Sequence, residues 1–412
     1  MTAESRDPGL AEQDGPGPER PYPFTPTRSL DLHALYQQVR KNEPLCPVRM
    51  PYGDPGLLVT RYEDVKAVFA DPRFRRAVPA GVDQPRVTPD LVPLGLMDMD
   101  PPEHTRIRRL IAASFTAQRA ESMRPATERL AAGLVAAMVE AGPTADLVRD
   151  FAVPFPIGVI CELLGVPFED RHRFHHWITE VNRLVGGDGG QARMASMGEL
   201  LMYMGELVKK RRAEPAADLI SELVAARDRE DRLTEEELVF LCMLLLIAGY
   251  ETTANEIADF AYVLFTHPEQ LALLKSRPEL LPDAVEELLR FTPLTVSAAY
   301  PRYAAAEVEL SGGTVPVGCP VLTSTNAANR DPEVFDGPDL LDLTRANGRQ
   351  HLSFGHGAHH CTGASLARME LQVALGALLA GMPGLRLACD PEDVEWKTGV
   401  LFRGPETLPI AW

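Results

Sequence analysis

A ten-residue segment near the C-terminus, Phe354–Gly363 (FGHGAHHCTG), contains residue types that bind a metal or a reactive ligand. Gly355 and Gly357 permit a tight turn in which a larger side chain would clash. A helix is expected to follow Cys361, and the free N–H groups at a helix start favour a thiolate. Gly363 leaves room for a flat ligand to approach that helix. A thiolate placed there is an electron-donating ligand for iron.

Two other interpretations fit this segment. One is a buried structural cysteine on a glycine turn, which is the commoner fate of a lone cysteine. The other is a zinc site formed by His356, His359, His360 and Cys361. Adjacent residues project in different directions, however, and no second pair of ligands at zinc spacing occurs elsewhere. The pattern as a whole therefore favours a single thiolate ligand.

A capping box at Thr234–Glu237 (TEEE) predicts the start of a long helix. The helical pattern continues to about His267, so about 33 residues would span about 50 Å at 1.5 Å per residue. Apolar residues occupy every side of its middle part, which predicts that the helix is buried. Such a helix can position side chains at the centre of the molecule.

Ala248–Thr253 (AGYETT) interrupts the apolar stretch of this helix. A glycine in a helix interior costs about 1 kcal/mol, and the small residues Ala248 and Gly249 would leave a groove for a flat cofactor and a diatomic ligand. Thr252 can donate to the carbonyl of residue 248. Glu251 beside this alcohol offers a proton path. An ordinary helix with Glu251 in a salt bridge fits the motif equally well.

Charged pairs on two further predicted helices could support such a site. Glu287 and Arg290 stand three residues apart, a spacing that usually gives a weak, solvated pair. His104 and Arg108 stand four residues apart, so they share one face of their helix. Taken alone, each pair is more often found at the surface.

Together these motifs resemble the cytochrome P-450 family. Phe354–Gly363 matches the haem-binding pattern F-G-x-G-x-H-x-C-x-G at every fixed position, and Ala248–Thr253 matches A-G-x-[D/E]-T-T. Met99–Arg106 closely resembles the bacterial members. The four motifs occur in the family's order, and the resemblance extends from about Tyr22 to the C-terminus. It implies the cytochrome P-450 fold around a buried haem.

The resemblance implies one haem b per chain and assigns roles to individual residues. Cys361 would be the axial ligand of the iron, and Glu251 and Thr252 would be the acid–alcohol pair of oxygen activation. The remaining haem contacts would come from aromatic, small and basic residues: Phe354, Gly355, Ala248 and Gly249 along the ring, and His104, Arg108, Arg302 and His359 at the propionates.

Glu287 and Arg290 would be the family's structural E-x-x-R pair behind the haem. The third partner of this pair is an arginine in other members, within a stretch that reads Pro338–Leu341 (PDLL) here. Leu stands where Arg is common. Arg345 or Arg330 could take the role, and the sequence does not decide between them.

The implied activity is insertion of one atom of O2 into an organic molecule, by hydroxylation or epoxidation. Electrons would come from a ferredoxin and an NAD(P)H-dependent ferredoxin reductase, and Arg106, Arg109 and Arg368 could form a basic rim that attracts an acidic ferredoxin. The expected pocket residues are mostly apolar: Leu244, Ile247, Val296, Ser297, Val400 and Leu401. They favour a medium-to-large, mostly apolar substrate, such as a polyketide or macrolide secondary metabolite. Oxidative coupling, peroxygenase chemistry and a non-catalytic haem carrier or sensor are alternatives.

The composition limits the class of protein. A net charge of −17 over 412 residues argues against a nucleic-acid partner. The six cysteines include no C-x-x-C pair, which fits a reducing cytoplasm. We identify no signal peptide, and the longest apolar stretch, Leu238–Ala248, is about half of the ~20 residues that cross a bilayer. We therefore expect a cytoplasmic protein that makes no membrane contact and is a monomer.

The expected architecture is mainly α with a minor β-rich part. Residues 1–20 are predicted to be disordered and residues 21–412 to form a single haem-thiolate monooxygenase domain. A short strand is expected at Leu57–Thr60, a helix at Tyr62–Ala70 and a long loop at Ala77–Leu96. Beyond the middle of the chain, strands are expected at Val308–Leu310 and Val315–Val317, and a final helix at about Thr362–Leu379.

Overall fold

The structure is a computed structural model that describes residues 18–24, 29–91, 95–184, 189–230, 233–298 and 300–412. The predicted disordered segment, residues 1–20, lies outside this description up to residue 17. Its last residue belongs to β1 (Arg20–Pro21), which pairs in parallel with β2 (Leu45–Arg49). The sheet thus includes Arg20, one residue before the predicted start of the domain at residue 21. Arg20 also forms an ion pair with Glu43 at 2.6 Å.

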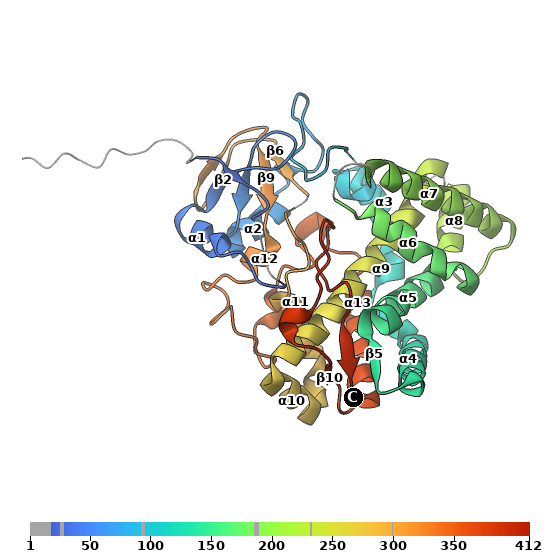
Figure 1. The fold of residues 1–412 in the computed structure, drawn as a ribbon. Helices are drawn as coiled ribbons and strands as arrows, with labels where there is room; N and C mark the ends of the chain where they lie inside the picture. The colour runs from blue at the N-terminus through green and yellow to red at the C-terminus, as the bar shows by residue number, and fades with distance from the viewer. Residues whose placement is uncertain (1–17, 25–28, 92–94, 185–188, 231–232, 299) are drawn as a thin grey trace, which may run out of the picture.

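The long helix α9 (Glu235–Thr266) runs diagonally through the middle of the molecule (Figure 1). Its predicted capping box is present: the hydroxyl of Thr234 accepts from the N–H of Glu237, and the carboxylate of Glu237 accepts from the N–H of Thr234 at 2.8 Å. By length and composition alone α9 could cross a membrane, but half of its most apolar window is buried inside this structure. It packs on α5 (Pro154–Leu164), α7 (Gly189–Ala213) and α13 (Ala364–Gly381).

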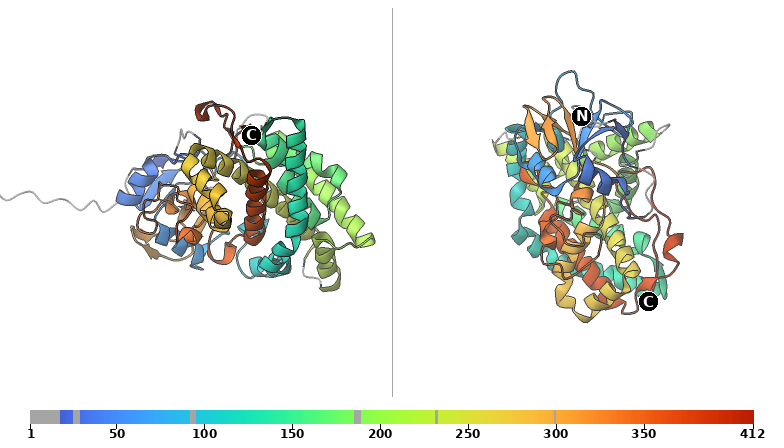
Figure 2. Two further views of the ribbon diagram at one scale, coloured as in Figure 1. Left: turned by 90° about the horizontal axis from the view of Figure 1, so that it is seen from below. Right: turned by 90° about the vertical axis from the view of Figure 1, so that its left-hand side faces the viewer.

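The other helices surround α9 and bury their apolar faces in one large core. The helices α13 and α4 lie side by side along much of their length (Figure 2). The segments Thr234–His267 and Thr362–Leu379, predicted as helices, are helical within three residues of the expected bounds. The remaining helices of this part are α3 (Glu103–Ala112), α4 (Ala117–Ala141), α6 (Arg171–Val181), α8 (Leu219–Glu230), α10 (Pro268–Ser276) and α11 (Leu281–Phe291).

The β-rich part contains a six-stranded sheet of order β1-β2-β3-β9-β6-β4. Its strands include the predicted one at 57–60, and the predicted helix at 62–70 is present with the expected bounds. The elements are β3 (Gly56–Val59), α2 (Tyr62–Ala70), β4 (Phe74–Arg75), β6 (Arg302–Ala304) and β9 (Pro320–Thr323), with α1 (Leu35–Asn42) and α12 (Thr325–Ala328) beside them. This sheet positions Arg302, one of the expected haem contacts.

Two smaller sheets complete the fold, which is mainly α with a minor β-rich part as predicted. Of the two strands expected after Pro293, β7 (Val308–Leu310) is as predicted, whereas β8 (Gly313–Val315) lies two residues before the expected bounds. The shift follows from the turn at Ser311–Gly312, which pairs Val308 with Val315. The other sheet joins β10 (Arg386–Leu387), β11 (Pro409–Ala411) and β5 (Thr144–Asp146).

Candidate active site

The cysteine loop is a tight turn that only glycine allows at two positions. Gly355 and Gly357 have φ of +68° and +69°, in the left-handed region. A Cβ on Gly357 would lie 2.4 Å from the carbonyl oxygen of Phe69. The loop closes where the N–H of Cys361 donates to the carbonyl of Phe354 at 2.8 Å. The turn predicted from the glycines is therefore confirmed, and it fixes Cys361.

Cys361 keeps accessible surface, but protein atoms surround its thiol closely. Burial raises its pKa, while the N–H of Gly363 and the charges of Arg108 and Arg368 lower it. The helix α13 begins only at Ala364, so its effect is weaker than the sequence suggested. The protein alone thus favours the thiol, and binding of a metal cation to the sulfur would displace its proton. A Cβ on Gly363 would meet no described atom closer than the Cys361 sulfur at 4.0 Å, so space is open there.

Four basic residues predicted as haem contacts lie close together beside this loop. The rings of His104 and His359 are 4.1 Å apart between centroids. Both ring nitrogens of His104 are buried and have no hydrogen-bond partner among the described residues. Burial, together with the charges of His104 and Arg302, lowers the pKa of His359 to about 3. Arg108 donates to the carbonyl of His360, beside the cysteine.

This cluster is positively charged and short of acids. Burial lowers the pKa of Arg302 to about 10, with a further contribution from the charge of Arg76, and Asp100 is the acid that opposes this effect. Like charges that are buried together are costly unless anions neutralise them. The orphaned nitrogens of His104 also require acceptors. Two carboxylates would meet both needs, so these residues fit the propionates of a haem.

Arg76 was not identified from the sequence. It is buried, and its guanidinium donates to the carbonyls of Met97, Tyr300 and Pro301 at 2.6–2.9 Å. Asp100 in turn accepts from the backbone N–H of Arg76 at 2.9 Å. Arg76 thus joins the segment before His104 to the segment before Arg302. No local pattern marks such a residue, because its partners are distant in sequence.

The AGYETT motif lies in the middle of α9, on a stretch of the helix that is partly accessible. Thr252 donates to the carbonyl of Ala248 at 2.8 Å, as predicted. Ala248 is exposed although most residues around it on α9 are buried. Gly249 lies beside it and also faces α5: a Cβ there would lie 2.8 Å from the Cδ1 atom of Ile160. The two small residues predicted to leave a groove thus stand together, and Gly249 is also close to α5.

Glu251 points to the end of α6 and not to the adjacent Thr252. Only 5% of the residue is exposed. Its carboxylate accepts from the side-chain amide of Asn182, the residue that follows α6. Burial raises the pKa of Glu251, and Lys397 and Asn182 partly offset this effect. The described residues form no ion pair with Glu251 within 4.0 Å, so the ordinary salt bridge considered above is absent from this part of the chain.

The E-x-x-R pair is buried. Arg290 donates to both carboxylate oxygens of Glu287 at 2.7 and 2.8 Å, and Arg345 donates to the same oxygens at 3.1 Å. Arg345 is therefore the third partner that the sequence left open. Arg330 instead pairs with Asp339 at 3.0 Å. The structure thus identifies the third partner, which the sequence alone did not determine.

The predicted basic rim is not formed as three free arginines. Arg106 forms an ion pair with Glu237 at 2.5 Å, and Arg368 forms one with Glu286 at 2.7 Å. Arg109 is exposed. These ion pairs neutralise much of the positive charge that the predicted rim required. The pairing could not be predicted because Glu237 and Glu286 lie on helices that the sequence did not place beside these arginines.

Three segments distant in sequence meet where the pocket wall was expected. The N–H of Val296 donates to the carbonyl of Leu401, and the N–H of Leu401 donates to the carbonyl of Asn182, both at 3.1 Å. Val400 pairs with Arg183 in an isolated bridge. Leu244 and Ile247 are half-buried on α9, and a cavity of about 250 Å³ opens beside Leu244. Ser297 is only 3% exposed and Leu401 9%, so both present less surface than Leu244 and Ile247.

The comparisons with known proteins agree with the geometry. The family model for cytochrome P-450 matches residues 191–381. The chain is 49% identical to the mycinamicin IV hydroxylase/epoxidase of Micromonospora griseorubida (95% of this chain, 98% of that protein). It is also 49% identical to the nocardicin C N-oxygenase of Nocardia uniformis subsp. tsuyamanensis, with the same coverage. The crystal structure of a cytochrome P-450 hydroxylase, LnmA, from the leinamycin pathway of Streptomyces atroolivaceus superimposes with a TM-score of 0.88 at 50% identity, covering 95% of this chain and all of that one.

Proposed function

Because the chain belongs to the cytochrome P-450 family, we propose how its own residues bind haem and serve a monooxygenase reaction. The chain is a monooxygenase that uses haem, O2, a small-molecule substrate and redox partners. The observation that supports the residue roles best is the acid-poor cluster of the buried His104 and Arg302 and the half-buried His359 beside the Cys361 loop. A group that carries both a metal for the thiol and carboxylates for the cations fits this arrangement.

In this proposal one haem b is bound per chain. Cys361 holds the iron as a thiolate, and Phe354 and Gly355 shape the loop that carries it. The four basic residues His104, Arg108, Arg302 and His359 bind the propionates, and Ala248 lies along the distal face. When bound, haem supplies the binding and reductive activation of O2. The open space beside Gly363 accommodates the ring.

Thr252 and Glu251 manage protons on the distal side. The hydroxyl of Thr252 now donates to the Ala248 carbonyl at 2.8 Å, and rotation of this side chain would turn its proton toward the open face of α9. Burial raises the pKa of Glu251, so it keeps its proton to a higher pH than an exposed carboxyl group and can serve as a proton donor. Asn182 holds the acid in place.

The substrate is proposed to be a medium-to-large, mostly apolar secondary metabolite, such as a macrolide or another polyketide. Two relatives are named for the oxidation of mycinamicin IV and of nocardicin C. In this chain apolar surface is supplied by Leu244, Ile247, Val296, Val400 and Leu401. These side chains offer no fixed charge. They therefore select by shape and apolar area, with hydroxylation or epoxidation as the reaction.

The remaining parts of the proposal concern the setting of the enzyme. We place residues 21–412 in one catalytic domain, active as a cytoplasmic monomer. Electrons come from a ferredoxin and its NAD(P)H-dependent reductase. Arg109 is the exposed arginine on the cysteine side that remains a candidate contact for the ferredoxin.

Spectral titration followed by isotope labelling tests the function. Purified holoprotein is titrated with a panel of macrolides, including mycinamicin IV, and each binder is incubated with ferredoxin, reductase, NADPH and ¹⁸O2. We expect a change in the ferric haem spectrum and a product that carries one labelled oxygen atom. Product without label from binders that do perturb the spectrum would contradict oxygen insertion and favour coupling chemistry.

A further inference from the structure

A row of polar residues follows one face of α9 away from the candidate oxygen site. Glu251, Asn255 and Asp259 stand four residues apart, so neighbours are separated by about 6 Å along the helix. All three are buried, with 5%, 2% and 0% of each residue exposed. Both carboxylate oxygens of Asp259 have no hydrogen-bond partner among the described residues. A stable helix core does not need such a row, because unpaired buried carboxyl groups are costly.

One lysine lies over the middle of this row. The ammonium group of Lys397 donates to the side-chain oxygen of Asn255 at 2.8 Å, and the side-chain amide of Asn255 donates to the backbone carbonyl of Glu251 at 2.8 Å. Burial raises the pKa of both Glu251 and Asp259, and the charge of Lys397 lowers both. Lys397 is thus a cation shared between the two acids.

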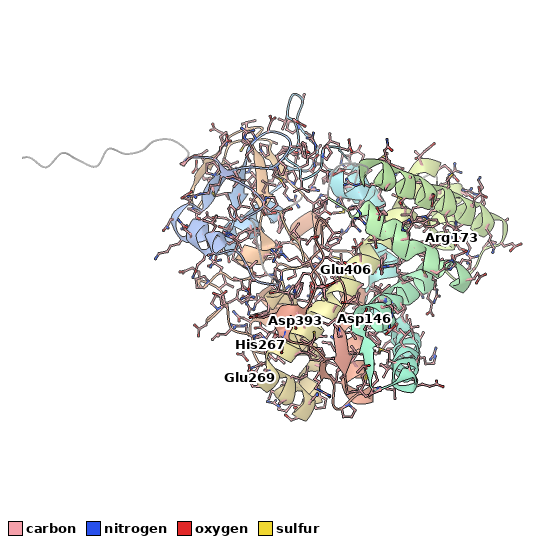
Figure 3. All side chains as sticks on the ribbon, in the orientation of Figure 1. Asp146, Arg173, His267, Glu269, Asp393 and Glu406 are labelled. Atoms are coloured by element: carbon pink, nitrogen blue, oxygen red, sulfur yellow. The ribbon has the colours of Figure 1, made fainter. Side chains whose placement is uncertain are left out.

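The loop that carries Lys397 is fixed tightly against α9. The N–H of Lys397 donates to the carbonyl of Gly404 at 3.0 Å. A Cβ on Gly404 would lie 2.3 Å from the side-chain oxygen of Asn255, so the loop backbone touches the polar row. Glu406, on the same loop, is seen in front of α9 in Figure 3. Because Leu401 also bonds the backbone of Asn182, one loop holds both Lys397 and the partner of Glu251.

We propose that Lys397 is a positioning residue of the proton supply: its ammonium group, held over Asn255 by the C-terminal loop, stabilises the carboxylate that remains each time Glu251 gives up a proton. This inference rests on the proposed function, in which Glu251 is the acid. Because the carboxyl group of Glu251 is bonded to Asn182 and not to Thr252, it must turn before its proton can pass toward Thr252. Lys397 keeps its own proton throughout. Its positive charge offsets the negative charge created in the buried row.

A simpler alternative is that Lys397 only ties the loop to α9 through its hydrogen bond to Asn255. Two substitutions separate these possibilities. Lys397→Gln keeps a side-chain donor for Asn255 but removes the charge, whereas Lys397→Arg keeps the charge. Lys275 provides a matched control, since its ammonium group ties another loop through the carbonyl of Pro383 at 2.9 Å, on α10 and outside the polar row.

Infrared spectroscopy of the holoprotein as a function of pH tests the proposal without a substrate. The C=O band of protonated Glu251 is isolated by subtracting the spectrum of Glu251→Gln recorded at the same pH. The titratable and charged groups around Glu251 are Lys397 and Glu406 on the loop, His175 on α6, and Tyr250 and Asp259 on α9. None of them is altered by the lysine substitutions except Lys397 itself.

We expect the midpoint of this band to move upward by about one pH unit or more in Lys397→Gln, because an opposite charge near the carboxylate is lost. Lys397→Arg and Lys275→Gln should keep the wild-type midpoint. An unchanged midpoint in Lys397→Gln, or an equal shift in Lys397→Arg, would overturn the inference and leave the proposed function intact. A wild-type enzyme that inserts no oxygen in the labelling assay would instead overturn the proposed function, and this role with it.

Discussion

On α11 the carboxylate of Glu287 receives hydrogen bonds from Arg290 and Arg345 at 2.7–3.1 Å, whereas on α9 the carboxylate of Asp259 has no described partner. Both acids are almost completely buried. Beside Glu287, Glu286 is paired with His351 and Arg368, and these contacts outweigh burial and hold its pKa at about 2. On α9, burial dominates and raises the pKa of Asp259.

The difference separates acids that hold the fold together from acids that remain able to exchange a proton. Cations contact both α11 acids and join α11 to the segments after it, and Glu286 stays ionised because its pKa is lowered to about 2. Two acids of the α9 row, Glu251 and Asp259, and the neighbouring Glu256 are buried, and all three have raised pKa values. Raised carboxyl pKa values near a reactive site favour proton transfer close to neutral pH.

The largest effect is expected from breaking the α11 group. Glu287→Ala or Arg290→Ala leaves a buried charge without its partner, which costs about 3–5 kcal/mol. Little folded holoprotein should be recovered, as measured by yield, haem content and urea unfolding. Glu206→Ala is a matched control, since Glu206 and Lys209 have the same spacing but are exposed. If the α11 variants unfolded like this control, the pair would be a surface contact in solution.

A second prediction concerns the pH dependence of Glu286. Because the folded pKa is depressed to about 2, Glu286 stabilises the fold above the unfolded pKa near 4.5, and this stability is lost as the pH falls toward 2. Glu286→Gln should therefore lower the free energy of unfolding at pH 7, by roughly 3 kcal/mol, and by progressively less as the pH is lowered through 4. Urea unfolding at several pH values measures the difference. A constant difference across this range would contradict the depressed pKa.

The opposite pH dependence is expected on α9. The folded pKa of Asp259 is raised, so its favourable contribution is complete below the unfolded pKa and is lost as the pH rises through the folded pKa. Asp259→Asn should thus gain stability relative to the wild type as the pH rises, by about 1.4 kcal/mol for each pH unit that separates the folded pKa of Asp259 from its unfolded pKa. The same urea series measures this gain. Asp259 would be paired in solution if the variant instead lost stability with rising pH.

The smallest effect in free energy is expected at Thr252. Thr252→Ala removes the hydroxyl that bonds the Ala248 carbonyl and leaves the apolar pocket residues in place. Substrate affinity and NADPH consumption should stay near wild type, while product per NADPH falls several-fold and hydrogen peroxide rises. Glu251→Gln should instead slow turnover, because the proton source is lost. Full product yield without extra peroxide in Thr252→Ala would show that the alcohol has no part in proton delivery.

Features encoded by short segments could be predicted from the sequence. The capping box of α9, the glycine turn before Cys361 and the Thr252 hydrogen bond depend on residues within four positions of each other, so the pattern determines the geometry. The resemblance to a family placed these motifs in one fold. It also predicted that Glu287 and Arg290 form a structural pair rather than a surface contact.

Features that depend on contacts between distant segments could not be predicted. Asn182 and Glu251 are 69 positions apart, and Lys397 and Asn255 are 142 apart. The close approach of Gly249 to Ile160 was not predicted either, because Ile160 lies on another helix. The choice of Arg345 over Arg330 is likewise made by the chain path after α11, which brings Arg345 back to Glu287.

The central claim is that Cys361 binds the haem iron as a thiolate. The most direct measurement is the absorption spectrum of the ferrous carbon monoxide complex, recorded for the wild type and for Cys361→Ala with equal haem content. We predict a red-shifted Soret band, typical of thiolate ligation, in the wild type and its loss in Cys361→Ala. The same red-shifted band in Cys361→Ala would contradict the account, because another residue would then be the ligand.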